Sequence, residues 1–159
     1  MRHWLMKTEP ETFGLEDLAK LPKRTTMWDG VRNYQARNMM RDAMKAGDQV
    51  FFYHSNTATP GIVGIAEVVR EAYPDHTAFD PDDPHFDSAS DPGRPRWYMV
   101  DVKYVRPLAR LVTLAELRNY PELAGLALLR KGNRLSVMPV AQAHWDFILS
   151  REDQAPAGG

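Results

Sequence analysis

The sequence predicts an α+β domain with a largely antiparallel, barrel-like sheet. Segments with strand character cluster in the middle of the chain, helical segments lie outside this block, and there is no regular alternation of strand and helix. The chain has 159 residues, of which 43% are hydrophobic and 26% charged, values typical of one globular domain. We expect residues 1–150 to form a single domain and residues 151–159 to form a frayed C-terminal tail.

The first third of the chain predicts one strand and two helices. The apolar run at residues 4–7 favours a buried strand, and the spacing of leucines predicts a short helix over residues 14–21, which Pro22 ends. A turn around Trp28 precedes a second helix over residues 32–45, and Gly47 follows as its stop signal.

The rest of the chain predicts four further strands and two helices. Aromatic and β-branched residues predict strands at residues 49–54 and 61–73, which a short connection joins as an antiparallel pair. Alternating polarity predicts a strand at residues 96–105. We also expect a last strand at residues 134–140 and helices at residues 113–118 and 141–149.

Residues 74–95, which we call the acidic segment, contain six Asp, five Pro and a single Arg, a net charge of −5. Proline and aspartate favour turns over a helix or a central strand. We therefore expect a long, solvated loop. A structureless loop of more than about 12–15 residues is uncommon in a compact domain unless it is functional or disordered.

The charge balance excludes a protein that coats nucleic acid through bulk electrostatics. The chain carries 20 Lys and Arg against 21 Asp and Glu, a net charge of −1. Without the acidic segment, 19 basic and 15 acidic residues remain, a net charge of +4. This modest excess allows a few phosphate contacts but not tight binding of nucleic acid by charge alone.

Other features favour an intracellular protein. The chain has no cysteine, which excludes disulfides, thiolate metal sites and cysteine nucleophiles. No apolar run reaches the roughly 18 residues that cross a bilayer, and Lys7 and Glu9 interrupt any signal-peptide core. We expect no membrane partner, and a cytoplasmic location in a bacterium or a nuclear one in a eukaryote.

No motif supports catalysis. The chain lacks a G-x-S-x-G nucleophile elbow, a phosphate-binding loop of the Walker type and a complete dinucleotide fingerprint. His and Asp residues are frequent in the acidic segment, but its prolines do not fit a calcium loop, so the segment is interpreted as solvated. The sequence thus predicts no catalytic residue, no metal and no cofactor.

Aromatic and polar residues could instead form a binding pocket. Trp28 lies beside a glycine in a loop that opens a helix bearing Asn33 and Arg37, and an aromatic strand delivers residues 54–56 to a connection. Recognition of a base requires a π-face for stacking and a few groups that read the base edge. The alternative is that Trp28 is a half-buried core residue and that the arginines form a solvated helix face.

Three motifs resemble the EVE domain: WLMKTEP at residues 4–10, WDGVRNYQARN at residues 28–38 and FYHSN at residues 52–56. The match continues in the same order to RLSVMPV at residues 134–140 and covers roughly residues 3–149. EVE domains belong to the PUA-like superfamily, with the YTH and ASCH domains. The resemblance implies a five- or six-stranded, mostly antiparallel β pseudobarrel flanked by short helices.

The resemblance also implies a non-catalytic module that recognises a modified base, such as a modified cytosine or a methylated adenine. The expected partner is DNA or RNA, and bacterial relatives suggest a nuclease or restriction-system partner. Trp28 would supply the stacking face. The other implied pocket residues are Lys7, Thr8, Val31, Asn33, Tyr53, His54, Ser55, Arg134 and Ser136. The implied phosphate contacts are Arg32, Arg37, Arg41, Arg94, Arg96 and Lys131.

Two other functions stay open at this point. ASCH relatives include hydrolases, so the chain could act on a nucleoside-like small molecule through Glu9, Asp29 and His54. The acidic segment could instead serve a protein-interaction adaptor. Of the neighbours Tyr53, His54 and Ser55, at least one must point away from any shared cavity, because successive strand residues face opposite sides.

Overall fold

A six-stranded sheet in the order β2-β5-β4-β3-β1-β6 organises the computed structural model, which describes residues 1–155. Every neighbouring pair of strands is antiparallel except β1 and β3. The prediction of a mostly antiparallel sheet is therefore confirmed, with six strands. The strands are β1 (His3–Thr8), β2 (Thr25–Met27), β3 (Gln49–His54), β4 (Gly61–Pro74), β5 (Tyr98–Thr113) and β6 (Val137–Val140).

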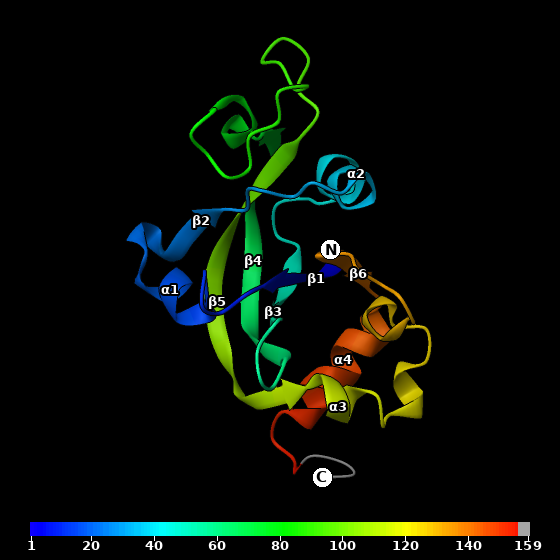
Figure 1. The fold of residues 1–159 in the computed structure, drawn as a ribbon. Helices are drawn as coiled ribbons and strands as arrows, with labels where there is room; N and C mark the ends of the chain where they lie inside the picture. Colours follow the sequence, from blue (N-terminus) through cyan, green and yellow to red (C-terminus); the bar gives the residue numbers. More distant parts are fainter. Residues whose placement is uncertain (156–159) are drawn as a thin grey trace.

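Short helices flank the sheet (Figure 1). The predicted second helix begins two residues late, at Tyr34, because the side chain of Asn33 accepts a hydrogen bond from the Ala36 N–H at 2.9 Å and caps it. None of the helices in residues 1–155 is long and apolar enough to cross a membrane. The helices are α1 (Leu15–Lys20), α2 (Tyr34–Asp42), α3 (Leu114–Leu117) and α4 (Gln142–Arg151), with 3₁₀ turns η1 (Pro22–Arg24), η2 (His76–Phe79), η3 (Pro121–Leu123) and η4 (Ala127–Leu129).

The two faces of the sheet carry separate hydrophobic clusters. Trp4 and Phe52 face α1 and α2, whereas their neighbours Leu5 and Phe51 face the other way, toward α4. Trp145 of α4 stacks on Phe51 with ring centroids 3.7 Å apart. Because side chains alternate along a strand, each residue of β1 and β3 is committed to one face. This commitment decides which of them can reach a surface cavity.

Three features of the sheet differ from the sequence prediction. The strand β2 was not predicted, and it pairs with β5 over only three residues. The strand β5 continues through Pro107 to Thr113 instead of ending near residue 105, because shifts of register let it follow the bend of β4. The last strand begins at Val137 instead of residue 134.

The acidic segment is folded rather than structureless. It contains η2, and in addition to Asp75, which accepts from the backbone N–H of Thr77, four of its aspartates each accept a hydrogen bond from the backbone N–H two residues later, at 2.8–2.9 Å. Such turns use the short carboxylate side chain in place of a backbone partner. The aspartates that suggested a solvated loop are therefore what shapes it. They are Asp80, Asp83, Asp87 and Asp91.

The packed chain extends past the expected start of the C-terminal tail at residue 151. Arg151 still belongs to α4, and the side chain of Glu152 accepts two hydrogen bonds from Arg106, at 2.8 and 2.9 Å. Arg110 donates to the carbonyl of Gln154 at 2.6 Å. The remainder of the expected tail, residues 156–159, lies outside the described residues.

A buried carboxylate, Asp48, joins three segments at the start of β3. The residue is 3% exposed, and its oxygens accept hydrogen bonds from the backbone of Arg2 (3.0 Å), the indole of Trp4 (3.0 Å) and the backbone of Lys45 (2.9 Å). Burial by itself raises the pKa of Asp48, but these donors outweigh burial and hold the pKa below its usual value.

We predict that Asp48→Asn lowers the free energy of unfolding by about 1–3 kcal/mol at pH 7, because an amide cannot accept all three bonds. The stabilisation is present above the unfolded-state pKa of 3.8 and is lost as the pH falls through the lower folded-state pKa. Chemical denaturation between pH 7 and pH 2 measures both effects. The control is Asp42→Asn, at a carboxylate 58% exposed on α2. Equal stability of the two variants would contradict the role of Asp48.

Candidate functional site

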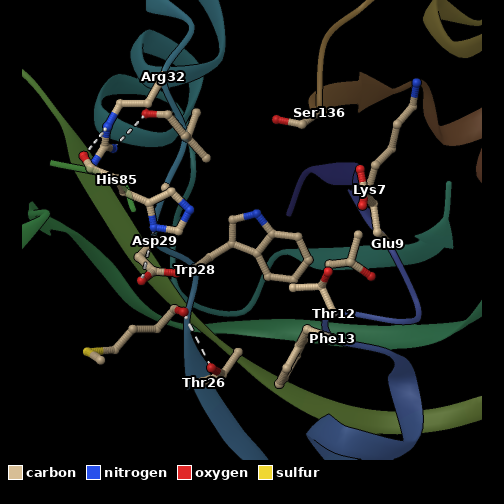
Figure 2. A pocket seen from close by; sticks show the side chains of 14 residues that line it. Lys7, Glu9, Thr12, Phe13, Thr26, Trp28, Asp29, Arg32, His85 and Ser136 are labelled. Carbon is tan, nitrogen blue, oxygen red and sulfur yellow. Dashed lines mark hydrogen bonds and ion pairs between the residues drawn. The ribbon is translucent and has the colours of Figure 1, made fainter. Parts of the chain in front are cut away.

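A cavity of about 610 Å³ lies between the end of β1 and the loop that joins β2 to α2. Its volume is within the range of small-molecule pockets, about 300–1,000 Å³. Figure 2 shows its lining side chains, with Trp28 at the centre. The lining residues are Lys7, Thr8, Glu9, Thr12, Phe13, Thr26, Met27, Trp28, Asp29, Gly30, Val31, Arg32, His85 and Ser136.

Trp28 forms the floor of this cavity. It is 7% exposed and packs edge to face on Phe52, with ring centroids 5.7 Å apart and planes at 83°. Its backbone N–H donates to the carbonyl of Val100 at 2.8 Å, which continues the pairing of β2 with β5. The indole N–H has no hydrogen-bond partner within residues 1–155, and in Figure 2 it faces the open centre. The floor therefore combines an aromatic surface with an unused donor.

Polar groups from β1 and from the chain before β6 form one wall. The backbone N–H of Lys7 donates to the carbonyl of Ser136 at 2.8 Å, which holds these two segments together. Burial lowers the pKa of Lys7, because a partly dry site disfavours the charged ammonium. The hydroxyl of Thr8 is buried and has no partner in the described part of the chain. The Thr8 hydroxyl is therefore a polar group of this wall that no described residue uses, whereas the ammonium of Lys7 lies 5.6 Å from the centroid of the Tyr53 ring.

The acidic segment supplies the opposite wall through His85. Arg32 donates to the carbonyl of His85 at 2.7 and 3.1 Å, and its Nη1 lies 3.0 Å from the carboxylate of Asp75. Asp75 is fully buried and also accepts from the backbone of Gly30 (2.9 Å) and of Thr77 (2.9 Å). Burial raises the pKa of Asp75, but these donors outweigh it and hold the pKa below its usual value.

Asp29 lies on the same wall, beside His85 (Figure 2). The Nδ1 atom of His85 is 3.9 Å from the carboxylate of Asp29 and 3.2 Å from that of Asp83. Burial raises the pKa of Asp29, and the negative charges of Asp75 and Asp83 add to this rise, while His85 opposes it. Across residues 1–155, no three His, Asp or Glu side chains are arranged to hold a metal ion.

The model of the EVE domain matches residues 2–151 of the chain. The chain belongs to the EVE domain family. Human thymocyte nuclear protein 1 is 48% identical over 172 residues, which cover 98% of this chain and 76% of the human protein. An uncharacterised protein of Schizosaccharomyces pombe is 41% identical over 160 residues, 92% of this chain and 66% of the yeast protein.

Solved structures of similar proteins share the fold. The crystal structure of human THYN1 in complex with 5-methylcytosine-containing DNA has a TM-score of 0.94 and 47% identity, and covers 98% of this chain and all of that one. A Pseudomonas putida protein has a TM-score of 0.90 and 46% identity, over 94% of this chain and 99% of that one. The YTH domain of Mmi1 has the same fold, with a TM-score of 0.51 and 18% identity over 94% of this chain and 86% of that one.

The structure brings half of the predicted EVE pocket residues to one cavity. Trp28, Lys7, Thr8, Val31 and Ser136 line it. The other five lie elsewhere. Asn33 caps α2, Tyr53 is buried on the α4 face of the sheet, and Arg134 is exposed. His54 accepts a hydrogen bond from the backbone of Leu15 at 3.1 Å, and the Ser55 hydroxyl donates to the carbonyl of Thr8 at 3.3 Å.

Sequence reasoning gave other lining residues no role in base binding. Glu9 and Asp29 were named only as candidates for an enzyme acting on a small molecule, although Glu9 directly follows Lys7 and Thr8, and Asp29 follows Trp28. His85 had no local signal, because Arg32, which holds it, lies 53 residues earlier. The further lining residues without a predicted pocket role are Thr12, Phe13, Thr26, Met27 and Gly30.

The predicted phosphate contacts gather mainly on α2 and the chain before β5. Tyr34, which is 50% exposed, stacks on Trp97 with centroids 4.8 Å apart, and the guanidinium of Arg37 lies 4.7 Å from the Tyr34 ring. Arg37 donates to the carbonyl of Arg96 at 2.8 Å. Arg32 is held by Asp75, and Arg41 pairs with Asp42 at 2.8 Å. Arg94, Arg96 and Lys131 are exposed.

We predict that Gly30→Ala disturbs the cavity wall more than Gly132→Ala does. Both glycines have a positive φ, +78° and +75°, so both variants meet left-handed strain of about 1–2 kcal/mol. Only at Gly30 would the new Cβ lie 2.5 Å from the His85 ring, and at Gly132 nothing lies within 4 Å. Chemical denaturation should show the larger loss for Gly30→Ala, and NMR should show displaced His85 ring signals. Equal losses with unchanged His85 signals would contradict this contact.

Proposed function

We propose that this EVE protein is a non-catalytic reader that accommodates a modified base of DNA, of the 5-methylcytosine type, in the Trp28 cavity. The observation that carries the proposal is the cavity itself: a buried tryptophan floor with an unpartnered indole N–H, walled by the unused hydroxyl of Thr8 and by Lys7. The relation to human THYN1, which was crystallised with 5-methylcytosine-containing DNA, supports this class of ligand.

The free energies of base stacking and base extrusion favour a reader whose affinity depends on the modification of the base. Stacking a base on an aromatic side chain contributes about 1–3 kcal/mol, and extruding a base from a duplex costs a few kcal/mol. The two nearly cancel, so hydrogen bonds to the base edge and contacts to the modifying group decide whether binding occurs. The volume of the cavity is within the ordinary range of small-molecule pockets, so it has room for the modifying group. The Thr8 hydroxyl on one wall and the Asp29 carboxylate on the other can form hydrogen bonds to the base edge.

The placement of the alternative residues favours a reader over an enzyme. Glu9 and Asp29 line the cavity, but His54 lies outside it, under the backbone of Leu15. The three candidate catalytic residues are therefore not brought together. The acidic segment is held by Asp75 and Arg32 as a wall of the cavity, which favours a role in the pocket over a role as an adaptor. RNA binding, a nuclease partner and the cytoplasmic or nuclear location stay predictions.

We predict that the wild type binds an oligonucleotide with one 5-methylcytosine more tightly than the same oligonucleotide with cytosine. Trp28→Phe should weaken binding of the modified strand about 5- to 10-fold, because the floor becomes smaller and the indole donor is lost. Fluorescence anisotropy with labelled oligonucleotides measures both affinities.

The matched control is Trp145→Phe, which alters a buried tryptophan on the opposite face of the sheet. It should cost similar stability and leave the affinity unchanged. Equal affinity of the wild type for both oligonucleotides, or an equal loss in both variants, would contradict the proposed pocket.

We predict that Arg37 and Arg94 each contact a phosphate beside the cavity. Arg37→Gln or Arg94→Gln should weaken binding to modified and unmodified strands alike. Each should also reduce the slope of log affinity against log salt by about 0.9 for duplex DNA, because one fewer counterion is released. Arg130→Gln, an exposed arginine after η4, is the control and should leave the slope unchanged. A slope unaltered in all three variants would exclude this surface.

A further inference from the structure

We propose that Asp29 makes the cavity selective for bases with an exocyclic amino group, so that 5-methylcytosine is accepted and thymine is rejected. This inference rests on the proposed function and names the group of that site which reads the base edge. The side chain directly follows the Trp28 floor in sequence and lies on the wall that the acidic segment completes.

The carboxylate of Asp29 has unused capacity to accept hydrogen bonds. An ionised carboxylate offers about four acceptor positions. Within residues 1–155, no other residue donates a hydrogen bond to it, and Nδ1 of His85 is 3.9 Å away, beyond hydrogen-bond distance. Asp75, on the same side of the cavity, instead accepts from Gly30, Arg32 and Thr77. Asp29 is thus the carboxylate on this wall that is open to a ligand.

The surroundings of Asp29 make a donor from the ligand valuable. Its side chain is 36% exposed, and burial together with the charges of Asp75 and Asp83 raises its pKa. A raised pKa means that the ionised form is poorly solvated where it lies. A ligand N–H that binds the carboxylate replaces part of the missing solvation, whereas a ligand carbonyl oxygen adds repulsion.

The two bases differ at the position that such a carboxylate would read. Cytosine presents an amino donor at position 4, and thymine presents an oxygen acceptor there. 5-Methylcytosine and thymine share the pyrimidine ring and the methyl group, so stacking and shape cannot separate them strongly. Discrimination by a hydrogen bond is large where an unmatched polar group is left in a desolvated site.

Glu9 is the other carboxylate of the cavity, and the structure favours Asp29 over it. Glu9 is exposed and lies on the opposite wall with Lys7. Water can satisfy an exposed carboxylate whichever base is bound, so Glu9 would discriminate weakly. This difference makes Glu9→Gln a matched control for Asp29→Asn, since each substitution exchanges a carboxylate for an amide at the same cavity.

The test compares the affinities for two oligonucleotides that differ only in one base, 5-methylcytosine or thymine, placed opposite an abasic site so that neither is paired. We expect the folded wild type to prefer 5-methylcytosine by at least 10-fold. Glu9→Gln, which also alters the cavity, should change the two affinities together and keep their ratio. Asp29→Asn should bring the ratio close to 1, because an amide can donate to the thymine oxygen. Thermal melting confirms that each variant is folded.

The possible outcomes separate this inference from the proposed function. Full preference in Asp29→Asn, or no preference in the wild type, overturns the role of Asp29 and leaves a base-binding cavity. Loss of preference in Asp29→Asn and Glu9→Gln alike overturns it as well, because the effect would then follow from the charge of the cavity. Failure of the folded wild type to bind either oligonucleotide overturns the proposed function and the inference with it.

Discussion

The cavity depends on one buried carboxylate. Asp75 accepts hydrogen bonds from Gly30 and Arg32 on one segment and from Thr77 on its own. These bonds fix the loop after β2 against the acidic segment, and Arg32 extends the connection to His85. A buried carboxylate without its donors would be strongly unfavourable, so the two segments must meet in this arrangement. The Trp28 floor and the His85 wall follow from that constraint.

The sheet supplies the second condition for the site. Alternation along β1 and β3 sends Leu5 and Phe51 toward α4, and Trp4 and Phe52 toward α2, so that Phe52 supports Trp28 from below. Where β1 ends, polar residues reach the same surface as this aromatic cluster. A base reader requires that combination of an aromatic floor and polar edges. The fold therefore places the site where a strand ends beside a loop held by the acidic segment.

Local patterns in the sequence could predict much of the fold and part of the site. Apolar runs and glycine or proline breaks predicted five of the strands and the main helices. The aromatic turn indicated Trp28, and the resemblance to the EVE domain added Lys7 and Thr8, which line the same cavity. The wall formed by Asp75 and His85 could not be predicted, because it joins residues 43 and 53 positions away from Arg32. Tyr53 and His54 were expected in the pocket because they share a motif, but pairing with β4 and contact with α1 turn them elsewhere.

The negative charges of the acidic segment also have a structural role. The acidic segment carries six aspartates, four of which shape its turns, while Asp75 anchors Arg32. Its negative charge thus contributes to building a wall, and the basic surface on α2 and before β5 stays available beside the cavity. A near-neutral net charge is compatible with such a division of roles, because recognition of one base needs few phosphate contacts.

The indole N–H signals of the four tryptophans test the central claim most directly. Trp4 and Trp97 donate to Asp48 and Asp87, Trp145 lies on the far face of the sheet, and Trp28 faces the cavity. In a ¹H–¹⁵N titration with an oligonucleotide carrying 5-methylcytosine, the signal of Trp28 should shift far more than those of Trp4 and Trp145. A Trp28 signal that does not move while the protein is saturated would contradict a base in this cavity.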